Sequence, residues 1–363
     1  MKNIYKINLQ LFALSNGVNA TVASGSMGAM KFDEATNSYV YANPNTALSA
    51  EMKTYYDMTL IDEAQAKLVH DQFGQKKPIP KGSGKTIEFR KFSPLAKALT
   101  PITEGVTPNG NSLTVTAINA TVAQYGDYIV QSDVLELTSL DNTIIEATKL
   151  LGNQAGLTLD TITRNILQAG TNVSFCPKIA ADGTETEVIS RASLDATSQL
   201  TVDMVQRAVT KLRAQNAPTI DGDYVAIIHP YVAYDLMRDK EWIEAHKYAN
   251  PDNIYAGEIG KIAGCRFVQS TEAKIYKGEG CPSGLAVFGT LFLGAGAYGV
   301  TEITGGGLQT IIKQKGSAGT ADPLDQRSSV GWKAIKTAER LVENYMVRVE
   351  SCSKRYSATA VAN

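Results

Sequence analysis

Apolar residues recur along residues 142–169 with the period of an α-helix. Asp141 is a suitable N-cap for this stretch, and Gly170 would end it. The pattern therefore predicts one helix of roughly 42 Å, at about 1.5 Å per residue. Gly152 and Gly156 each weaken it by up to about 1 kcal/mol relative to Ala, so a kink is easiest there. The apolar positions are Ile144, Ile145, Leu151, Ala155, Leu159, Ile162, Ile166 and Leu167.

A pattern of β-strands surrounds a long connection before this helix. Residues 86–92 and 113–130 are rich in β-forming residues and predict the two strands of an extended hairpin. About 20 residues join them, and a connection of that length without structure of its own is usually functional. It contains three prolines, yet it also carries Leu95, Leu99, Ile102 and Val106. Because a two-stranded hairpin is only marginally stable alone in water, we expect it to dock on another surface, most simply a neighbouring copy of the chain.

The rest of the chain predicts a mixed, α+β arrangement. Residues 47–73 have helical spacing, and residues 337–354 alternate as one long strand. Between them, alternating helices and strands predict a compact α/β or α+β module over about residues 200–310. Its elements are a helix at 202–214, a strand at 224–228, a helix opened by Pro230, and strands at 260–269 and 285–288.

Composition narrows the classes of protein to consider. The chain has 363 residues, 44% of them hydrophobic and 20% charged, and a formal net charge of −1. A protein that grips nucleic acid by bulk electrostatics would carry a basic excess, so that class is disfavoured. No apolar run is long enough to span a bilayer. The apolar patch near the N-terminus is interrupted by Asn8 and Gln10, which disfavours a secretory signal.

The four cysteines are Cys176, Cys265, Cys281 and Cys352, and no two of them form a CxxC pair. This spacing favours free thiols in a reducing compartment over disulfides or a metal site. No cofactor is expected.

Two glycine-rich stretches resemble phosphate-binding motifs. Gly82-Ser83-Gly84-Lys85-Thr86 ends like a P-loop, but Ile79 stands where the motif needs glycine, and a strand is predicted to follow. Gly294, Gly296 and Gly299 match GxGxxG, but the residues after them also favour a strand rather than a helix. Neither motif predicts a nucleotide site.

The three histidines, His70, His229 and His246, lie far apart in sequence. No nucleophile elbow, HExxH pair or nearby cysteine completes a catalytic set around any of them. Structural histidines are therefore favoured, and the sequence predicts a protein that is not an enzyme.

Three segments, in their order along the chain, resemble the major capsid proteins of tailed phages with the Hong Kong 97-like fold, and more narrowly the phage N-four-like capsid subfamily. They are ITEGVTPNGNSLTVTAINATVAQYGDYIVQSDVLELTSLD (102–141), DYVAIIHPYVAYDLMRD (223–239) and GEIGKIAGCRFVQST (257–271). The opening KINLQLFA is also similar to the start of many phage structural proteins. The resemblance runs from about residue 45 to residue 352.

The resemblance implies a role for each part of the chain. Residues 1–75 would be an N-terminal arm, and residues 76–132 an extended loop that lies over an adjacent subunit. Residues 133–200 would form a peripheral domain with a long spine helix, to which residues 315–363 return. Residues 201–314 would form an axial domain around the capsomer axes.

The resulting expectation is a structural protein that self-assembles into hexamers and pentamers of an icosahedral shell around double-stranded DNA. Portal, scaffolding and decoration proteins are expected partners, the DNA would be held without sequence-specific binding, and no membrane is involved. The protein would lie in the virion after assembly in the host cytoplasm. Predicted intersubunit contacts are Leu95, Leu99, Ile102 and Val106 in the hairpin, with Tyr125 and Tyr128 at its base.

Two alternatives remain open from the sequence. One is a nucleotide-binding enzyme that uses Lys85 of the GSGKT stretch. The other is a phage tail or surface-binding module, which would share the β-rich loops but form small rings or monomers.

Overall fold

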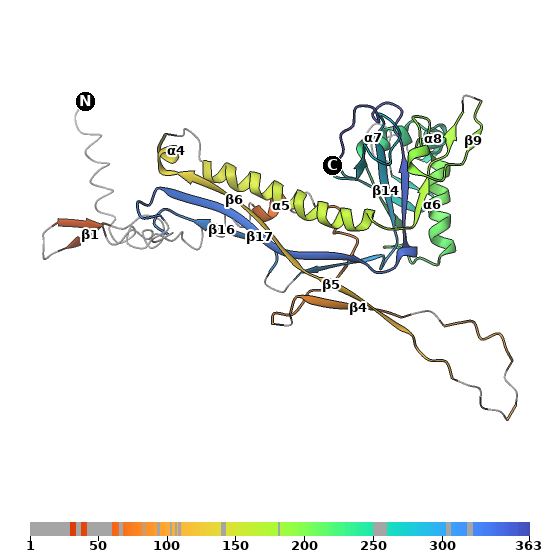
Figure 1. Ribbon diagram of the computed structural model, residues 1–363, viewed down its shortest axis with the longest axis horizontal. Helices are drawn as coiled ribbons and strands as arrows, with labels where there is room; N and C mark the ends of the chain where they lie inside the picture. Colours follow the sequence, from red (N-terminus) through yellow and green to blue (C-terminus); the bar gives the residue numbers. More distant parts are fainter. Residues whose placement is uncertain are drawn as a thin grey trace. The chain divides into compact units, whose positions relative to one another are not determined.

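Figure 1 shows the computed structural model of the chain, coloured along the sequence. It combines helices and strands in a mixed α/β arrangement. The structure describes residues 30–33, 38–41, 60–64, 68–82, 84–92, 95–101, 104–105, 107, 110–138, 143–180, 182–249, 260–302, 306–317 and 322–363.

The chain divides into two compact units. Unit 1 comprises Met1–Ala66, Tyr125–Gly156 and Leu308–Ala334, and unit 2 comprises Lys67–Gln124, Leu157–Gly307 and Ile335–Asn363. Two long elements, helix α5 (Thr143–Gln168) and strand β17 (Arg327–Arg340), each contribute residues to both units.

Unit 2 is built on a sheet that has seven strands among the described residues. The central strands β10 (Tyr224–Ile228) and β14 (Val287–Leu293) are buried at every position, as expected for strands covered on both faces. The strand order is β11 (Lys261–Ile262), β12 (Cys265–Gln269), β10, β14, β18 (Met346–Ser351) and β7 (Val173–Phe175), with β13 (Ile275–Tyr276) paired to β14. β10 runs parallel to β12 and antiparallel to β14.

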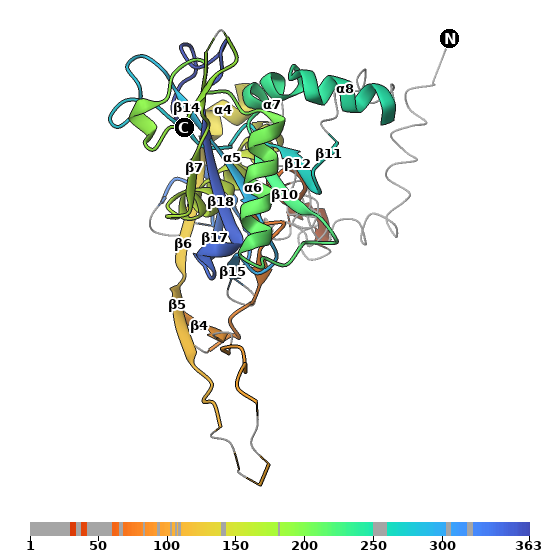
Figure 2. The ribbon, with the colours of Figure 1, turned by 90° about the vertical axis from the view of Figure 1, so that its right-hand side faces the viewer.

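Helices α6 (Val202–Ala214) and α7 (Pro230–Met237) pack on this sheet through a shared apolar core, and α6 lies in front of its strands in Figure 2. The helix expected at 202–214 is confirmed. Thr201 caps it by accepting a hydrogen bond from the backbone N–H of Met204, 3.3 Å away. Its buried residues follow the helical period: Val202, Met204, Val205, Ala208, Val209 and Leu212.

The long helix expected at 142–169 is also confirmed, as the uninterrupted α5. Gly152 lies against the helical residues 60–64 of unit 1, where a Cβ would come within 2.9 Å of the carbonyl oxygen of Leu60. Glycine at this position therefore allows close helix packing, which offsets its low helix propensity. Asp141, its predicted N-cap, lies outside the described residues.

Strand β17 organises a second set of strands. In unit 2 its C-terminal part pairs with β15 (Tyr298–Glu302), which in turn pairs with β3 (Gln75–Lys76). In unit 1 its N-terminal part pairs with β16 (Gln309–Lys313), and β6 (Ala123–Ser132) also pairs with β17. The remaining elements are β1 (Met30–Asp33), β2 (Ser38–Tyr41), β4 (Thr86–Phe92), β5 (Val115–Thr121), α4 (Asp133–Thr138), β8 (Lys178–Ile179), β9 (Glu185–Thr186), α8 (Lys240–Ala249) and the 3₁₀ turns Arg191–Ser193 and Glu343–Tyr345.

Four sequence-based expectations about these elements are wrong. The strand expected over 113–130 is divided into β5 and β6, which pair in different sheets. The strand expected over 260–269 is the antiparallel pair β11 and β12. The helix expected over 47–73 does not reach its predicted end, because residues 70–73 form a turn. The single strand expected over 337–354 is two strands, β17 and β18, in different sheets. The 3₁₀ turn at Glu343–Tyr345 separates them, and an ion pair between Arg340 and Glu343 (2.9 Å) lies at this turn.

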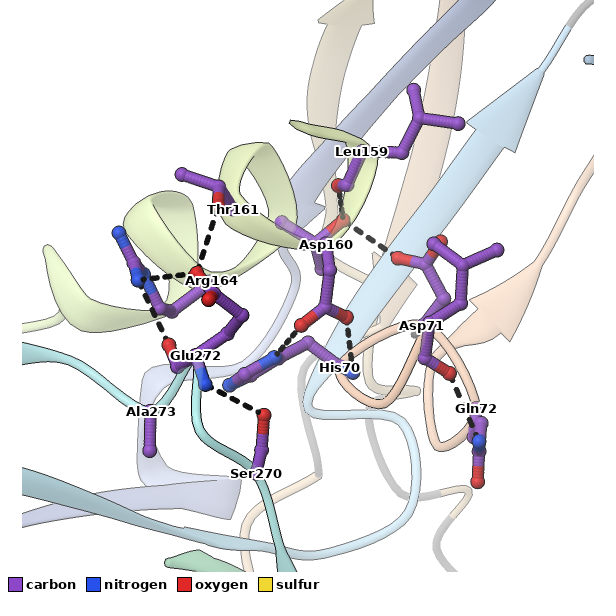
Figure 3. A network of polar contacts seen from close by, with 12 residues as sticks. His70, Asp71, Gln72, Leu159, Asp160, Thr161, Arg164, Ser270, Glu272 and Ala273 are labelled. Carbon is purple, nitrogen blue, oxygen red and sulfur yellow. Dashed lines mark hydrogen bonds and ion pairs between the residues drawn. The ribbon is translucent and has the colours of Figure 1, made fainter. Parts of the chain in front are cut away.

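A buried polar network inside unit 2 explains the turn at residues 70–73. The Asp160 carboxylate on α5 accepts a hydrogen bond from the backbone N–H of His70 at 2.7 Å. Its other oxygen lies 2.7 Å from Nδ1 of the His70 ring. Both side chains are fully buried. Figure 3 shows Asp160 facing His70 across the gap between α5 and this turn. A continued helix would have satisfied the backbone N–H of His70 internally, so the tertiary bond replaces the helical one.

The network extends from Asp160 in two directions, towards Asp71 and towards Glu272. Thr163 donates a hydrogen bond to Asp71 (2.6 Å), and Lys336 of β17 forms an ion pair with the same carboxylate. On the other side, Arg164 donates to the carbonyl oxygen of Glu272 at 2.8 Å (Figure 3). The Tyr298 hydroxyl of β15 donates to the carbonyl oxygen of His70. Polar contacts thus connect the turn at residues 70–73 to α5, β15 and β17.

Replacing Asp160 with Asn should lower the free energy of unfolding by about 3 kcal/mol, because it leaves a buried hydrogen-bonding partner mismatched. Glu146→Gln, on the exposed part of the same helix, is the matched control. It removes a surface ion pair with Lys149 and a negative charge in the first turn of the helix, and should cost less than about 1 kcal/mol. Urea unfolding of the unassembled subunit, followed by circular dichroism, measures both. Equal unfolding midpoints for the two variants would contradict the structural role of Asp160.

Candidate interaction surface

The extended hairpin expected from the sequence is present in unit 2. β4 matches its predicted bounds, and it pairs antiparallel with β5 from Thr86↔Thr121 to Phe92↔Val115. We call residues 86–121 the hairpin arm. Figures 1 and 2 both show its strands β4 and β5 lying outside the large sheet of unit 2.

The base of the hairpin arm is anchored within its own unit by an aromatic side chain. Phe89 is only 4% exposed, and its ring lies against Gly299 of β15, where a Cβ would come within 2.7 Å of the ring. The Lys77 ammonium donates a hydrogen bond to the carbonyl oxygen of Glu88 (3.1 Å) and lies 5.5 Å from the Phe89 ring centroid. Because Gly299 has no side chain, the Phe89 ring of β4 can pack directly against strand β15.

The outer part of the hairpin arm exposes large apolar side chains. Leu95 is 56% exposed and Leu99 is 82% exposed. Phe92, Leu113 and Val115 are also exposed. Burying one leucine side chain stabilises a structure by about 1.5–3 kcal/mol, so burial of these residues against another surface would stabilise that contact.

The six predicted contact residues are found in different situations. Leu95 and Leu99 are exposed on the hairpin arm, whereas Ile102 and Val106 lie outside the described residues. Tyr125 and Tyr128 belong to β6 in unit 1, where Tyr125 is half-buried and Tyr128 is 68% exposed. Their contact with a second copy stays a prediction.

Unit 1 carries a second surface that the sequence did not point to. Tyr128 borders a pocket of about 350 Å³ between β6, β16 and β17. We call it the β6–β17 pocket. It is lined by Gly126, Asp127, Tyr128, Ile311, Ser329, Gly331 and Trp332. At Gly331 a Cβ would lie 2.7 Å from Tyr128 Cβ, so glycine is what lets the two strands pack this closely.

A fixed carboxylate lies in the wall of the β6–β17 pocket. The Gln154 side-chain amide of α5 donates to Asp127 Oδ2 (2.6 Å), and the backbone N–H of Tyr128 donates to Oδ1 (2.8 Å). These two hydrogen bonds lower the pKa of Asp127 below its usual value, so it is ionised at neutral pH. Gln154 is itself oriented by the Trp332 indole N–H, which donates to its Oε1 at 3.3 Å. None of the ion pairs formed by the described residues involves Asp127.

Comparison with known proteins identifies the family of this chain. The profile of a family described as "Phage capsid protein" matches residues 114–338, more than half of the chain. The chain belongs to this family of phage capsid proteins. No curated protein sequence matches it.

Solved structures similar to this capsid protein share its fold. The cyanophage Pam1 capsid subunit has a TM-score of 0.60 at 13% identity, covering 90% of this chain and 99% of that one. The cyanophage P-SCSP1u capsid gives 0.59 at 15% identity, covering 77% and 87%. The Ralstonia phage GP4 capsid gives 0.59 at 14% identity, covering 80% and 89%. The fold of these phage capsid subunits is therefore also the fold of this chain, as expected for a structural protein of a bacteriophage.

The glycine-rich stretches of the capsid protein lead into strands, as the sequence predicted. β4 begins at Thr86, directly after Lys85, where a P-loop would need a helix N-terminus. Gly82 and Gly84 have φ of 88° and 87°, the left-handed conformation of a turn. Gly299 likewise lies inside β15, and not at the start of a helix. The stretches therefore lack the strand–turn–helix geometry that holds phosphates.

Two histidines of the capsid protein have structural surroundings. His70 is part of the buried network described above, and His229 caps α7 by accepting a hydrogen bond from the backbone N–H of Tyr231 (3.1 Å). The side chain of His246 lies outside the described residues. In the described part of the chain, no group of three His, Cys, Asp or Glu side chains is placed to hold a metal ion. None of the described helices has the length and apolar character of a membrane span.

The four cysteines are free thiols. Cys176, Cys265 and Cys352 are buried, and Cys281 is half-buried. Burial raises the pKa of all four thiols, that of Cys352 to about 12.

Replacing Phe89 with Ala should reduce the free energy of unfolding by about 3 kcal/mol, because it empties the contact with Gly299. Phe92→Ala, on the same strand but 60% exposed, should change it by less than about 0.5 kcal/mol. Thermal unfolding of the two unassembled variants separates them. A large loss in the Phe92 variant alone would contradict the anchoring of the hairpin arm at Phe89.

The stability of the subunit should fall as pH decreases from about 6.5 towards 4. Burial lowers the pKa of His229 to about 4, so the unfolded chain binds the proton first and protonation favours unfolding. The stabilisation is complete above the unfolded pKa of about 6.5, and about 3 kcal/mol is lost by pH 4. His229→Asn keeps a side-chain cap but removes the titration, so urea unfolding of this variant should show a smaller pH dependence over that window. An unchanged pH profile would exclude His229 as the source.

Proposed function

We propose that this phage capsid protein is the major capsid protein of a tailed phage, with the Hong Kong 97-like fold and a place in the phage N-four-like subfamily. Many copies self-assemble into hexamers and pentamers of an icosahedral shell that encloses double-stranded DNA. The protein is structural and needs no cofactor. It resides in the virion after assembly in the host cytoplasm.

The observation that carries this proposal is the contrast between the two ends of the hairpin arm. Its base is fixed by the buried Phe89, while Leu95 and Leu99, which follow the end of β4, are exposed. Exposed leucines on an anchored projection fit a contact with another molecule better than a place in the core of their own subunit. In a symmetric shell each copy gives one such contact and receives one, so many modest contacts add up through closure.

The proposal assigns a role to each segment. Residues 1–75 form an N-terminal arm, and residues 76–132 form the extended loop that lies over a neighbouring subunit. Residues 133–200 and 315–363 form the peripheral domain, whose spine is α5. Residues 201–314 form the axial domain, which meets its counterparts around the capsomer axes. Leu95, Leu99, Ile102, Val106, Tyr125 and Tyr128 are the proposed intersubunit contacts.

The proposed partners follow from the same role. Portal, scaffolding and decoration proteins would bind the shell. The packaged DNA would be held without sequence-specific contacts, in keeping with a net charge of −1 on the subunit. A wall with little net positive charge does not trap the DNA that it encloses.

Deleting residues 94–110 should give a folded subunit that forms no shells. The deletion removes Leu95 and Leu99, but Ser93 and residues 111–114 still close the hairpin between Phe92 and Val115. Light scattering and negative-stain microscopy of purified protein measure assembly, and circular dichroism checks the fold. Normal particles from the deleted chain would overturn the role of the hairpin arm. A wild-type protein that forms only monomers or small rings would favour a tail module.

A further inference from the structure

The β6–β17 pocket of unit 1 combines apolar walls with one fixed negative charge. Tyr128, Ile311 and Trp332 supply apolar surface, and the Asp127 carboxylate is held in one position by Gln154. A carboxylate that is already oriented loses little conformational entropy when it binds a cation. The chemistry of this pocket therefore fits a segment that presents apolar side chains on either side of a lysine or arginine.

The hairpin arm carries a segment of this composition. Residues 95–99 read Leu-Ala-Lys-Ala-Leu, so Lys97 is flanked by two exposed leucines. The Lys97 side chain is exposed as well, and none of the ion pairs among the described residues involves it. Both surfaces thus have unused apolar area, and each has one unpaired charge of opposite sign.

The charge distribution along the chain supports the same pairing. Residues 76–97 contain seven basic residues and one acidic residue, whereas the two segments of unit 1 that line the pocket, 125–156 and 308–334, together contain seven acidic and five basic residues. These segments lie in unit 2 and unit 1, respectively. Complementary potentials of this kind guide association and fix its register.

We propose that the β6–β17 pocket of one copy receives the Leu95–Leu99 segment of the hairpin arm of a second copy, with Lys97 paired to Asp127. The inference rests on the proposed function, because it names the surface that receives the hairpin arm. Trp332 acts as a positioning residue, since it orients Gln154 and through it the Asp127 carboxylate.

A charge exchange tests the pairing in the full-length protein. Lys97→Glu and Asp127→Lys should each lower the yield of assembled particles at least about tenfold, because each places like charges together at the contact. The double variant should restore assembly to within about threefold of wild type. Asp127→Asn, which removes the charge and keeps the size of the side chain, should give a smaller loss in the same direction.

Lys85→Glu is the matched control, because it makes the same charge change in an exposed lysine at the base of the hairpin arm. It should not restore assembly to the Asp127→Lys variant. Light scattering and negative-stain microscopy measure the yield, and circular dichroism confirms that each variant is folded.

Several results would overturn the inference. A wild-type yield of particles from either single variant would contradict the proposed ion pair. Equal rescue of the Asp127→Lys variant by Lys85→Glu would show that only the overall charge matters. Loss of assembly with Asp127→Lys but not with Lys97→Glu would assign the pocket to a different occupant. If the 94–110 deletion abolishes assembly while the exchange has no effect, the pairing fails and the proposed function stands. Normal assembly of the deleted chain would instead count against the proposed function itself.

Discussion

Unit 2 depends on a charged network that is almost entirely removed from water. The carboxylate of Asp160 and the ring of His70 are fully buried, and Asp71, Lys336 and Thr163 continue the same set of contacts. A buried charge without partners would cost several kcal/mol, so α5, the turn at residues 70–73 and β17 must come together for any of them to be stable there. The turn leads along the chain to β3 and then to the hairpin arm. The network therefore fixes the place from which the projection starts.

The sequence predicts the elements that bury one continuous face. α5, α6 and β4 were expected at nearly their observed bounds, because their apolar spacing directly reflects the core contacts they make. The turn at residues 70–73 was missed because its local spacing is helical, while the backbone N–H of His70 is bonded to Asp160, 90 positions away. The break between β17 and β18 was missed because strand alternation continues on both sides of a three-residue turn. Local patterns do not record such tertiary contacts.

The hairpin arm and the β6–β17 pocket also differ in how far the sequence alone predicts them. Leu95 and Leu99 can be found from sequence, since apolar residues in a long proline-containing connection need an explanation. Asp127 cannot, because its distinctive state comes from Gln154, 27 positions away, and Gln154 is oriented by Trp332, another 178 positions along the chain. A carboxylate becomes a defined recognition group only when its donors hold it, and those donors are visible only in the folded chain.

The buried thiols have a consequence for chemical durability. A thiol whose pKa is raised stays protonated at neutral pH, and it is the thiolate that reacts with disulfides and oxidants. Cys176, Cys265 and Cys352 are both buried and held in the protonated form. These three thiols should thus stay free both under reducing conditions and in oxygenated surroundings. A particle made of such subunits can change environment without its walls acquiring new crosslinks at these positions.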